Sequence, residues 1–223
     1  MFPDRLVDGY NAFLAKRFPH ERARFQKLAE SGQDPRIMII GCIDSRVSPE
    51  EIFDALPGEI LVVRNVANLV PRFAPEAAGH NSTSAALEFA VEALAVEHIV
   101  VMGHAQCGGI KAFAETNEPL STWDFVGHWM AQVRPAADRL SAEGAERGPD
   151  WLTRLEQASI AASLANLTTF PWVRERVREG RLSLHGAYFS IADGQLLVRD
   201  PHTGAFGPLA AGSAPRTALL HCR

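Results

Sequence analysis

The stretch Ile37-Met-Ile-Ile40-Gly-Cys42-Ile-Asp44-Ser-Arg46 decides the fold, because a continuous apolar run ends in reactive and charged side chains. Such a run, without alternation of polar residues, is typical of a central parallel strand that is buried on both faces. The run Ile99-Val-Val-Met102 has the same character and leads into Gly103-His104-Ala-Gln-Cys107-Gly-Gly. Two buried strands that end in thiol and imidazole side chains indicate a metal site better than they indicate core packing.

Helices are expected between these strands. Ser48-Pro49-Glu50-Glu51 offers an N-cap serine, proline at the first helical position and glutamate three residues after the cap, and this helix must end by Pro57-Gly58. Ile60–Val63 is expected to be a strand. Leu87, Ala90, Val91 and Leu94 mark a second helix, with Ser82, Thr83 and Ser84 available as caps, and another helix is expected to begin near Cys107.

The C-terminal half continues the alternation with helices over 150–167 and 171–179 and a hairpin of strands over 182–191 and 195–198. Alternating strands and helices predict a single α/β domain with a mostly parallel sheet. Residues 36–200 are therefore expected to form the zinc-binding domain, and residues 201–223, rich in Gly, Ala and Pro, a loosely held tail.

Residues 1–35 are expected to form an N-terminal helical arm. Leu6, Tyr10, Phe13 and Leu14 recur at helical spacing among polar residues, which is typical of an amphipathic helix. So many apolar side chains ahead of the first strand predict packing on a partner subunit. Packing of the arm on its own domain is the alternative, and the pattern alone does not separate the two.

Composition excludes several classes of protein. The 223 residues carry a net charge of −4, which gives no basic stripe for nucleic acid or for a membrane surface. No apolar stretch approaches the roughly 20 residues that span a bilayer, and no signal peptide is visible. Three cysteines do not form a disulfide framework, and their place at strand ends favours metal binding in a reducing compartment. We therefore expect a cytoplasmic protein.

The spacing of the polar residues predicts one shared site. Cys42, Asp44 and Arg46 are two apart, so they share a face as the chain leaves its strand. His104 and Cys107 face together on a turn, and the carboxyl ends of neighbouring strands meet at one edge of the sheet. A lone buried cysteine is more often an inert small hydrophobe, and His-x-x-Cys alone is a weak signal. Their combination favours a tetrahedral zinc site with one position open.

Four motifs together are similar to those of β-class carbonic anhydrases. They are Cys-x-Asp-Ser-Arg at 42–46, Pro-Gly-Glu at 57–59, Val-Val-Arg-Asn-Val-Ala-Asn at 62–68 and Gly-His-x-x-Cys-Gly-Gly at 103–109. The resemblance runs from about Ser31 to Asp200. It implies four parallel strands extended by an antiparallel edge strand and flanked by helices. It also implies a homodimer, or a tetramer, in which the N-terminal helix lies on the partner.

The resemblance implies an enzyme that hydrates carbon dioxide reversibly to bicarbonate and a proton. Cys42, His104 and Cys107 would hold one Zn²⁺ per subunit, and Asp44 with Arg46 would form the catalytic dyad. Zinc in carbonic anhydrases lowers the pKa of a bound water, so that a zinc-bound hydroxide attacks carbon dioxide. If Arg46 released Asp44, the carboxylate would become the fourth ligand and close the site, and we hypothesise that this balance depends on pH.

The resemblance also implies substrate contacts. Gln33 and the backbone N–H of Gly108 would bind bicarbonate, Gln33 from the partner subunit. An apolar pocket would be lined by Leu61, Val66 and Phe89. Some bacterial members have a non-catalytic bicarbonate site made by a tryptophan, an arginine and a tyrosine. In this chain the arginine is Arg64, but the other two positions are Ile39 and Phe189, so we predict that this inhibitory site is absent.

Three other functions remain open at this point. Hydrolysis of carbon disulfide or carbonyl sulfide on the same zinc site is the nearest alternative, although nothing in the chain suggests an insertion that would form a tunnel. A non-catalytic zinc-binding or sensor protein would have a saturated four-ligand site and no need for Asp44 beside Arg46. A thiol redox role for Cys42 and Cys107 lacks the adjacent Cys-x-x-Cys pair.

Overall fold

The computed structural model describes residues 1–75, 81–115, 118–119, 121–144 and 147–209. These residues form a six-stranded sheet in the order β2-β1-β3-β4-β5-β6. The first four strands in that order are parallel, and β5 and β6 are antiparallel to their neighbours. The strands are β1 Ile37–Cys42, β2 Ile60–Asn65, β3 His98–His104, β4 Ser183–Ser190, β5 Gln195–Arg199 and β6 Phe206–Pro208.

The strand pattern confirms the predicted α/β architecture, with one correction. The expected hairpin forms between β4 and β5. Residues 206–208, which were expected to belong to a loosely held tail, instead pair with β5 as β6, from Leu197–Pro208 to Arg199–Phe206. The sheet therefore has two antiparallel strands at this edge where one was expected. A segment as short as Phe-Gly-Pro carries no alternation from which a strand can be predicted.

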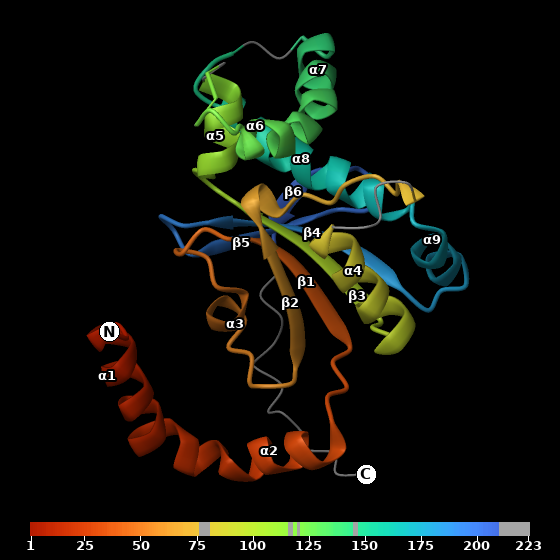
Figure 1. Ribbon diagram of the computed structural model, residues 1–223. Coiled ribbons are helices and arrows are strands. Elements are labelled where there is room, and N and C mark those ends of the chain that lie inside the picture. The colour runs from red at the N-terminus through yellow and green to blue at the C-terminus, as the bar shows by residue number, and fades with distance from the viewer. Residues whose placement is uncertain (76–80, 116–117, 120, 145–146, 210–223) are drawn as a thin grey trace.

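Helices cover the sheet and gather at one end of it (Figure 1). α4 (Ser82–Glu88) and α9 (Pro171–Arg178) lie along one face, while α5 (Gly108–Glu115), α6 (Phe125–Met130), α7 (Arg134–Ala142) and α8 (Trp151–Leu167) stand beyond the carboxyl ends of the parallel strands. α8 also packs on β3 and β4. The described residues also form short helical turns: α3 Pro49–Ile52, η2 Val66–Asn68, η4 Phe89–Ala93 and η5 Ala131–Val133.

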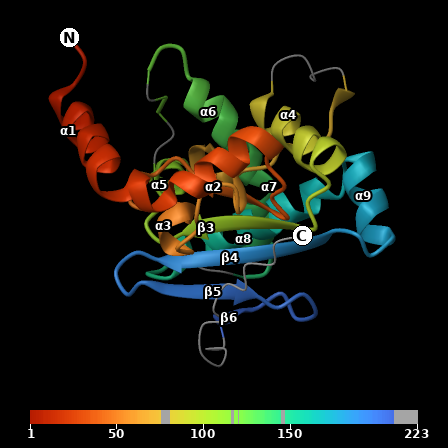
Figure 2. The same cartoon turned by 90° about the horizontal axis from the view of Figure 1, so that it is seen from below.

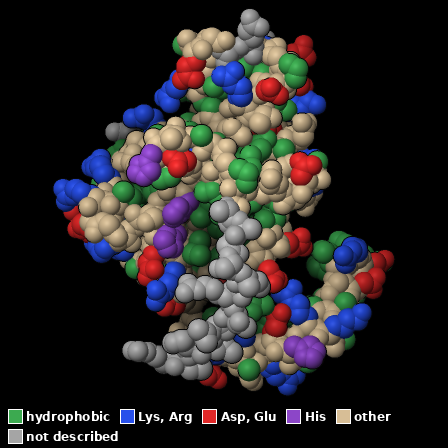
Figure 3. All heavy atoms as spheres, turned by 180° about the vertical axis from the view of Figure 1, so that it is seen from behind, with side chains coloured by type: hydrophobic (Ala, Val, Ile, Leu, Met, Phe, Trp, Pro, Cys, Tyr) green, Lys and Arg blue, Asp and Glu red, His purple; other side chains and the backbone are tan. Residues whose placement is uncertain are grey.

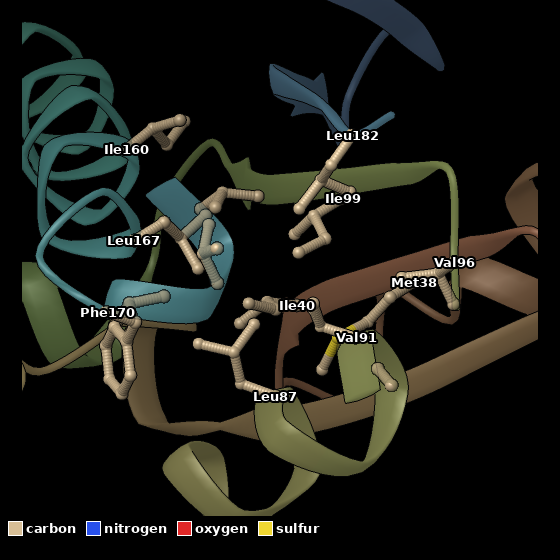
Figure 4. Packing of buried hydrophobic residues seen from close by; sticks show 14 of the residues in the cluster. Met38, Ile40, Leu87, Val91, Val96, Ile99, Ile160, Leu167, Phe170 and Leu182 are labelled. Atoms are coloured by element: carbon tan, nitrogen blue, oxygen red, sulfur yellow. The ribbon is translucent and has the colours of Figure 1, made fainter. Parts of the chain in front are cut away.

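The main hydrophobic core lies between the sheet and these helices (Figure 4). Met38 and Ile40 of β1 meet Leu87 and Val91 of the α4–η4 segment, and all four are fully buried. On β1, Ile39 points to the opposite face, where it packs with Met102 and Ala187. Both faces of β1 are therefore apolar, which is why the run Ile37–Ile40 shows no alternation.

Two helix starts test the expected caps. α3 begins as predicted, with Ser48 at the N-cap and Pro49 at the first helical position, although the Ser48 hydroxyl bonds to the Glu50 carboxylate and not to the backbone. α4 begins one residue away from the expectation. Its N-cap is Asn81, whose side chain accepts a hydrogen bond from the Ser84 N–H at 3.0 Å. Asparagine caps a helix as well as serine does, so the run of hydroxyl residues alone was misleading.

The N-terminal arm consists of α1 (Asp4–Ala12), the π-helical turn η1 (Phe13–Arg17) and α2 (Phe18–Ser31). α2 lies below the sheet in Figure 1 and across it in Figure 2, while α1 extends away from the body of the molecule in both views; the arm also projects in Figure 3. Neither helix contains a buried residue, and Leu6, Tyr10 and Leu14 are all exposed. The arm therefore presents an apolar face that its own chain does not cover. No helix among the described residues is long and apolar enough to cross a membrane.

Candidate metal centre

Three buried side chains meet at the carboxyl ends of β1 and β3. Cys42 ends β1, His104 ends β3, and Cys107 immediately precedes α5. The two sulfur atoms and an imidazole nitrogen all lie within 4.8 Å of one another. Cys42 is 4 % exposed, and His104 and Cys107 are 1 % exposed. Parallel pairing of β1 with β3 brings the two half-motifs together, as their position after two central strands predicts.

The orientation of His104 shows that this cluster fits a metal ion. Its Nδ1 lies 2.9 Å from the Ala105 carbonyl oxygen, so the proton sits on Nδ1 and Nε2 is left as a lone-pair donor. Nε2 is buried and has no hydrogen-bond partner among the described residues. A buried nitrogen without a partner is costly unless a ligand completes it. Two thiolates and one imidazole are a donor set that suits Zn²⁺ and leaves one tetrahedral position open.

The two thiols interact strongly with each other. A hydrogen bond from the Cys107 thiol lowers the pKa of Cys42 to about 4, against the opposing effect of burial. The pKa of Cys107 is raised because its thiol is the donor to the neighbouring sulfur and is buried. The hydrogen bond between the two sulfur atoms therefore favours ionisation of Cys42, and zinc binding would release the remaining thiol proton.

Asp44 and Arg46 form a bidentate ion pair beside the cluster. Arg46 Nε donates to Asp44 Oδ1 at 2.9 Å and Arg46 Nη2 to Oδ2 at 2.6 Å, while the Arg46 backbone N–H also donates to Oδ1 at 3.0 Å. These bonds hold the pKa of Asp44 well below its usual range. Asp44 Oδ2 lies 3.9 Å from His104 Nε2. An ionised carboxylate, fixed by arginine, therefore borders the metal position.

The loop between Cys42 and Val47 is held by a residue whose role we did not predict. Arg64 on β2 donates from Nε to the Cys42 carbonyl at 2.8 Å. Its Nη2 donates to the carbonyls of Asp44 at 2.7 Å and Val47 at 3.2 Å. One guanidinium thus fixes the backbone on both sides of the Asp44 carboxylate. The sequence identified Arg64 only through a bicarbonate site that it predicts to be absent.

A buried carboxylate behind the cluster was also missed. Glu156 on α8 is 2 % exposed, and its carboxylate accepts hydrogen bonds from the Cys107 N–H at 2.8 Å and the Tyr188 hydroxyl at 2.7 Å. Burial raises the pKa of Glu156. A signal exists in the sequence, because Glu156 stands four residues before Ile160 and eleven before Leu167, on the buried face of the helix.

Of the five predicted substrate residues, two lie beside the cysteine cluster and three do not. Val66 lies in η2 and packs against the Cys42 and Cys107 cluster, and Gly108 begins α5 with open space where a Cβ would stand. The structure does not bring the other three to the zinc ligands of the same chain. Leu61 pairs with Met38 near the start of β2, Phe89 is 51 % exposed at the end of α4, and Gln33 is exposed before β1, beyond its opposite end from Cys42.

The fold and the cluster together define an α/β protein with a candidate metal site at the carboxyl end of a parallel sheet. The family model described as carbonic anhydrase matches residues 37–196. Carbonic anhydrase 1 of Escherichia coli O157:H7 is 36% identical over 218 residues, which cover 98% of this chain and 96% of the relative. The chain therefore belongs to the carbonic anhydrase family and is of the β class.

Further relatives agree in fold. The structure of the β-carbonic anhydrase CcaA matches with a TM-score of 0.84 and 32% identity, covering 92% of this chain and 98% of that one. A tetrameric β-carbonic anhydrase of Sordaria macrospora matches with a TM-score of 0.76 and 29% identity, over 92% and 98% of the two chains. Chloroplastic β-carbonic anhydrase 5 of Arabidopsis thaliana is 37% identical over 85% of this chain, and the match spans 62% of that relative's length.

Proposed function

We propose that the protein is a zinc enzyme that interconverts carbon dioxide and bicarbonate. The observation that carries this proposal is the position of the Asp44 carboxylate, which Arg46 fixes at the edge of the buried Cys42, His104 and Cys107 cluster. A purely structural zinc site has no use for an ionised carboxylate at its open side. Membership of the carbonic anhydrase family supports the same reaction.

The three ligands would hold zinc through both sulfur atoms and His104 Nε2. When bound, zinc supplies a Lewis acid that makes water nucleophilic at neutral pH, and carbonic anhydrase is itself the standard example of that chemistry. The Ala105 carbonyl keeps the His104 proton on Nδ1 and so keeps Nε2 available. The two thiolates would place two negative charges among buried side chains.

Asp44 would act as a hydrogen-bond acceptor at the open position. Its low pKa keeps the Asp44 carboxylate ionised, so it accepts hydrogen bonds and donates none. An O–H group at the open position would be oriented by donating its hydrogen bond to Asp44. Arg46 occupies both carboxylate oxygens and so keeps Asp44 from becoming a metal ligand. Val66 would supply apolar surface, and the backbone N–H of Gly108 at the start of α5 would donate to bound bicarbonate.

The same proposal includes an oligomer. The uncovered apolar face of the N-terminal arm would lie on a partner subunit, as a dimer or a tetramer, and Gln33 would then contact bicarbonate in the partner's site. The relative from Sordaria macrospora is a tetramer. We also propose that residues 36–200 form the catalytic domain and that the enzyme works in the cytoplasm, without a nucleic-acid or membrane partner.

Stopped-flow measurement of carbon dioxide hydration tests the reaction. Zinc-loaded protein should hydrate carbon dioxide at alkaline pH, and Asp44→Asn should lower the rate by about 100-fold or more, as expected for a group that positions a proton. Glu97→Gln is the matched control, because it removes the carboxylate of an exposed ion pair with Arg36, far from the metal position. Zinc-loaded protein without activity would refute the proposal and favour a non-catalytic zinc protein. Turnover of carbonyl sulfide but not carbon dioxide would favour the hydrolase.

A further inference from the structure

Glu156 presents a problem that the proposed reaction does not explain. Its carboxylate is buried in the middle of α8, and no Lys or Arg of the described chain forms an ion pair with it. The donors that contact it are uncharged, among them the Cys107 N–H and the Tyr188 hydroxyl. Burying a carboxylate without a cation is costly, so a purely apolar side chain would pack there more cheaply. The position therefore requires an acceptor.

The backbone that this carboxylate contacts is strained. Gln106, between His104 and Cys107, has a φ of +58°, in the left-handed region that residues with a Cβ seldom adopt. Such a conformation persists only where the surroundings hold it. The turn that delivers Cys107 to the metal position therefore depends on contacts from outside the turn.

Those contacts act on the two ends of one peptide group. The Gln106 carbonyl oxygen accepts a hydrogen bond from Arg46 Nη2 at 3.1 Å, and the Cys107 N–H donates to Glu156 Oε1 at 2.8 Å. These two atoms belong to the same peptide bond. A hydrogen-bond donor therefore faces its carbonyl and an acceptor oxygen faces its N–H, so both ends of the peptide group are satisfied in this orientation. A flipped peptide would point its carbonyl at Glu156 and its N–H at Arg46, and both contacts would be repulsive.

We propose that Glu156 is a positioning residue, which together with Arg46 clamps the Gln106–Cys107 peptide and so places the Cys107 sulfur for zinc. Tyr188 fixes the second carboxylate oxygen and keeps the first aimed at the Cys107 N–H. The inference rests on the zinc site of the proposed function but not on the reaction. If it holds, the side chain at position 156 must be long enough to reach the Cys107 N–H and must present an acceptor oxygen, but it need not be charged.

Two variants separate reach from charge. Glu156→Gln keeps the side-chain length and an acceptor oxygen but removes the charge, and its amide donates to the Tyr188 oxygen. Glu156→Asp keeps the charge but is one methylene too short to reach the Cys107 N–H. Ser163→Ala is the control for general damage to the same buried helix, because Ser163 Oγ bonds to the Val70 N–H and not to the metal turn.

The measurement is the zinc dissociation constant, obtained by competition with a chromophoric chelator, together with the visible spectrum of Co²⁺-substituted protein. We expect Glu156→Asp to weaken zinc binding by about 10- to 100-fold, the range for partners that orient metal ligands, and to shift the cobalt bands. The zinc dissociation constant of Glu156→Gln should stay within about 3-fold of the wild-type value. Ser163→Ala should change neither the dissociation constant nor the cobalt spectrum.

Each other outcome decides against the clamp. If Glu156→Gln loses zinc and Glu156→Asp keeps it, charge and not position is required. If neither variant differs from wild type, or if Ser163→Ala weakens zinc as much as Glu156→Asp, Glu156 has only a structural role. Should Glu156→Asp fail to fold, Tyr188→Phe must still weaken zinc binding, and an unchanged constant overturns the inference. Wild-type protein that binds zinc but does not hydrate carbon dioxide would refute the proposed function and leave this test intact.

Discussion

Replacing Arg64 by methionine should destabilise the protein far more than an ordinary surface substitution. Arg64 donates to three carbonyls of the loop that carries Asp44, from Cys42 at 2.8 Å, Asp44 at 2.7 Å and Val47 at 3.2 Å. Cys42 and Val47 are 4 % and 1 % exposed, so their carbonyls have little access to water once the guanidinium is gone. Methionine fills similar space but donates nothing.

The magnitude follows from these three bonds. A hydrogen bond to a charged group contributes about 1.5–3 kcal/mol, and the Asp44 carbonyl is partly hydrated after the substitution. We therefore expect the free energy of unfolding of Arg64→Met to fall by about 3–5 kcal/mol. In a domain of this size, about 1 kcal/mol shifts the melting temperature by roughly 2–4 °C, so the midpoint should fall by about 10 °C. The free energy of unfolding of Arg64→Lys should lie between those of the wild type and Arg64→Met, because an ammonium group cannot reach all three carbonyls.

Urea unfolding followed by circular dichroism measures this change, at fixed concentrations of protein and zinc because both affect the midpoint. Arg36→Met is the matched control: its side chain is 71% exposed and pairs with Glu97 at the surface, so its loss should cost less than about 1 kcal/mol. A loss below about 1 kcal/mol in Arg64→Met, with an unchanged m-value, would refute the reasoning, since the three carbonyls would then not depend on Arg64.

Three further predictions concern inhibition by bicarbonate, the effect of pH on stability, and zinc binding by two glycine variants. Because Ile39 and Phe189 stand where an inhibitory bicarbonate site needs tryptophan and tyrosine, added bicarbonate should cause no cooperative loss of activity, and sigmoidal inhibition would contradict this. Burial lowers the pKa of His185 below its ordinary value, so the unfolded chain takes up that proton at a higher pH than the folded one. Stability should therefore fall as pH drops below about 6.5, and this fall in melting temperature between pH 7.5 and 6 should be smaller in His185→Gln. A Cβ on Gly109 would lie 2.9 Å from a side chain of η2, whereas one on Gly108 would meet nothing, so chelator competition should show weaker zinc binding for Gly109→Ala than for Gly108→Ala.

The elements of the site that could be predicted are those that follow directly on a strong local pattern. Cys42 and His104 end continuous apolar runs, and parallel pairing of adjacent strands brings such ends together without further information. Asp44 and Arg46 do pair as their predicted shared face requires, although residues 45–46 form a turn and not an extended segment. For Cys42 and His104 the ends of the two strands therefore decide where the side chains lie, and for Asp44 and Arg46 the turn after β1 does.

The residues that were missed act over long separations in the chain. Arg64 reaches the loop after Cys42 from the neighbouring strand β2, and Glu156 reaches Cys107 from a helix residue 49 positions further along the chain. Neither contact has a spacing that a sequence pattern encodes. Both satisfy backbone groups in irregular segments, and such groups need a partner wherever the fold can provide one. The sequence therefore predicted which side chains gather at the candidate site, and it did not predict which side chains hold the loops that carry them.

The contacts of Arg46 show why the two half-motifs must act as one unit. Its guanidinium holds the Asp44 carboxylate on one side and the Gln106 carbonyl on the other, so it joins the loop after β1 to the turn after β3. An Asp44 carboxylate that left Arg46 to bind the metal would leave this guanidinium with the Gln106 carbonyl alone. Closure of the site would then loosen one half of the clamp on Cys107 at the moment when zinc gains a fourth protein ligand. Glu156, which holds the N–H of the same peptide without contacting Arg46 or Asp44, is what would keep Cys107 in place in both states.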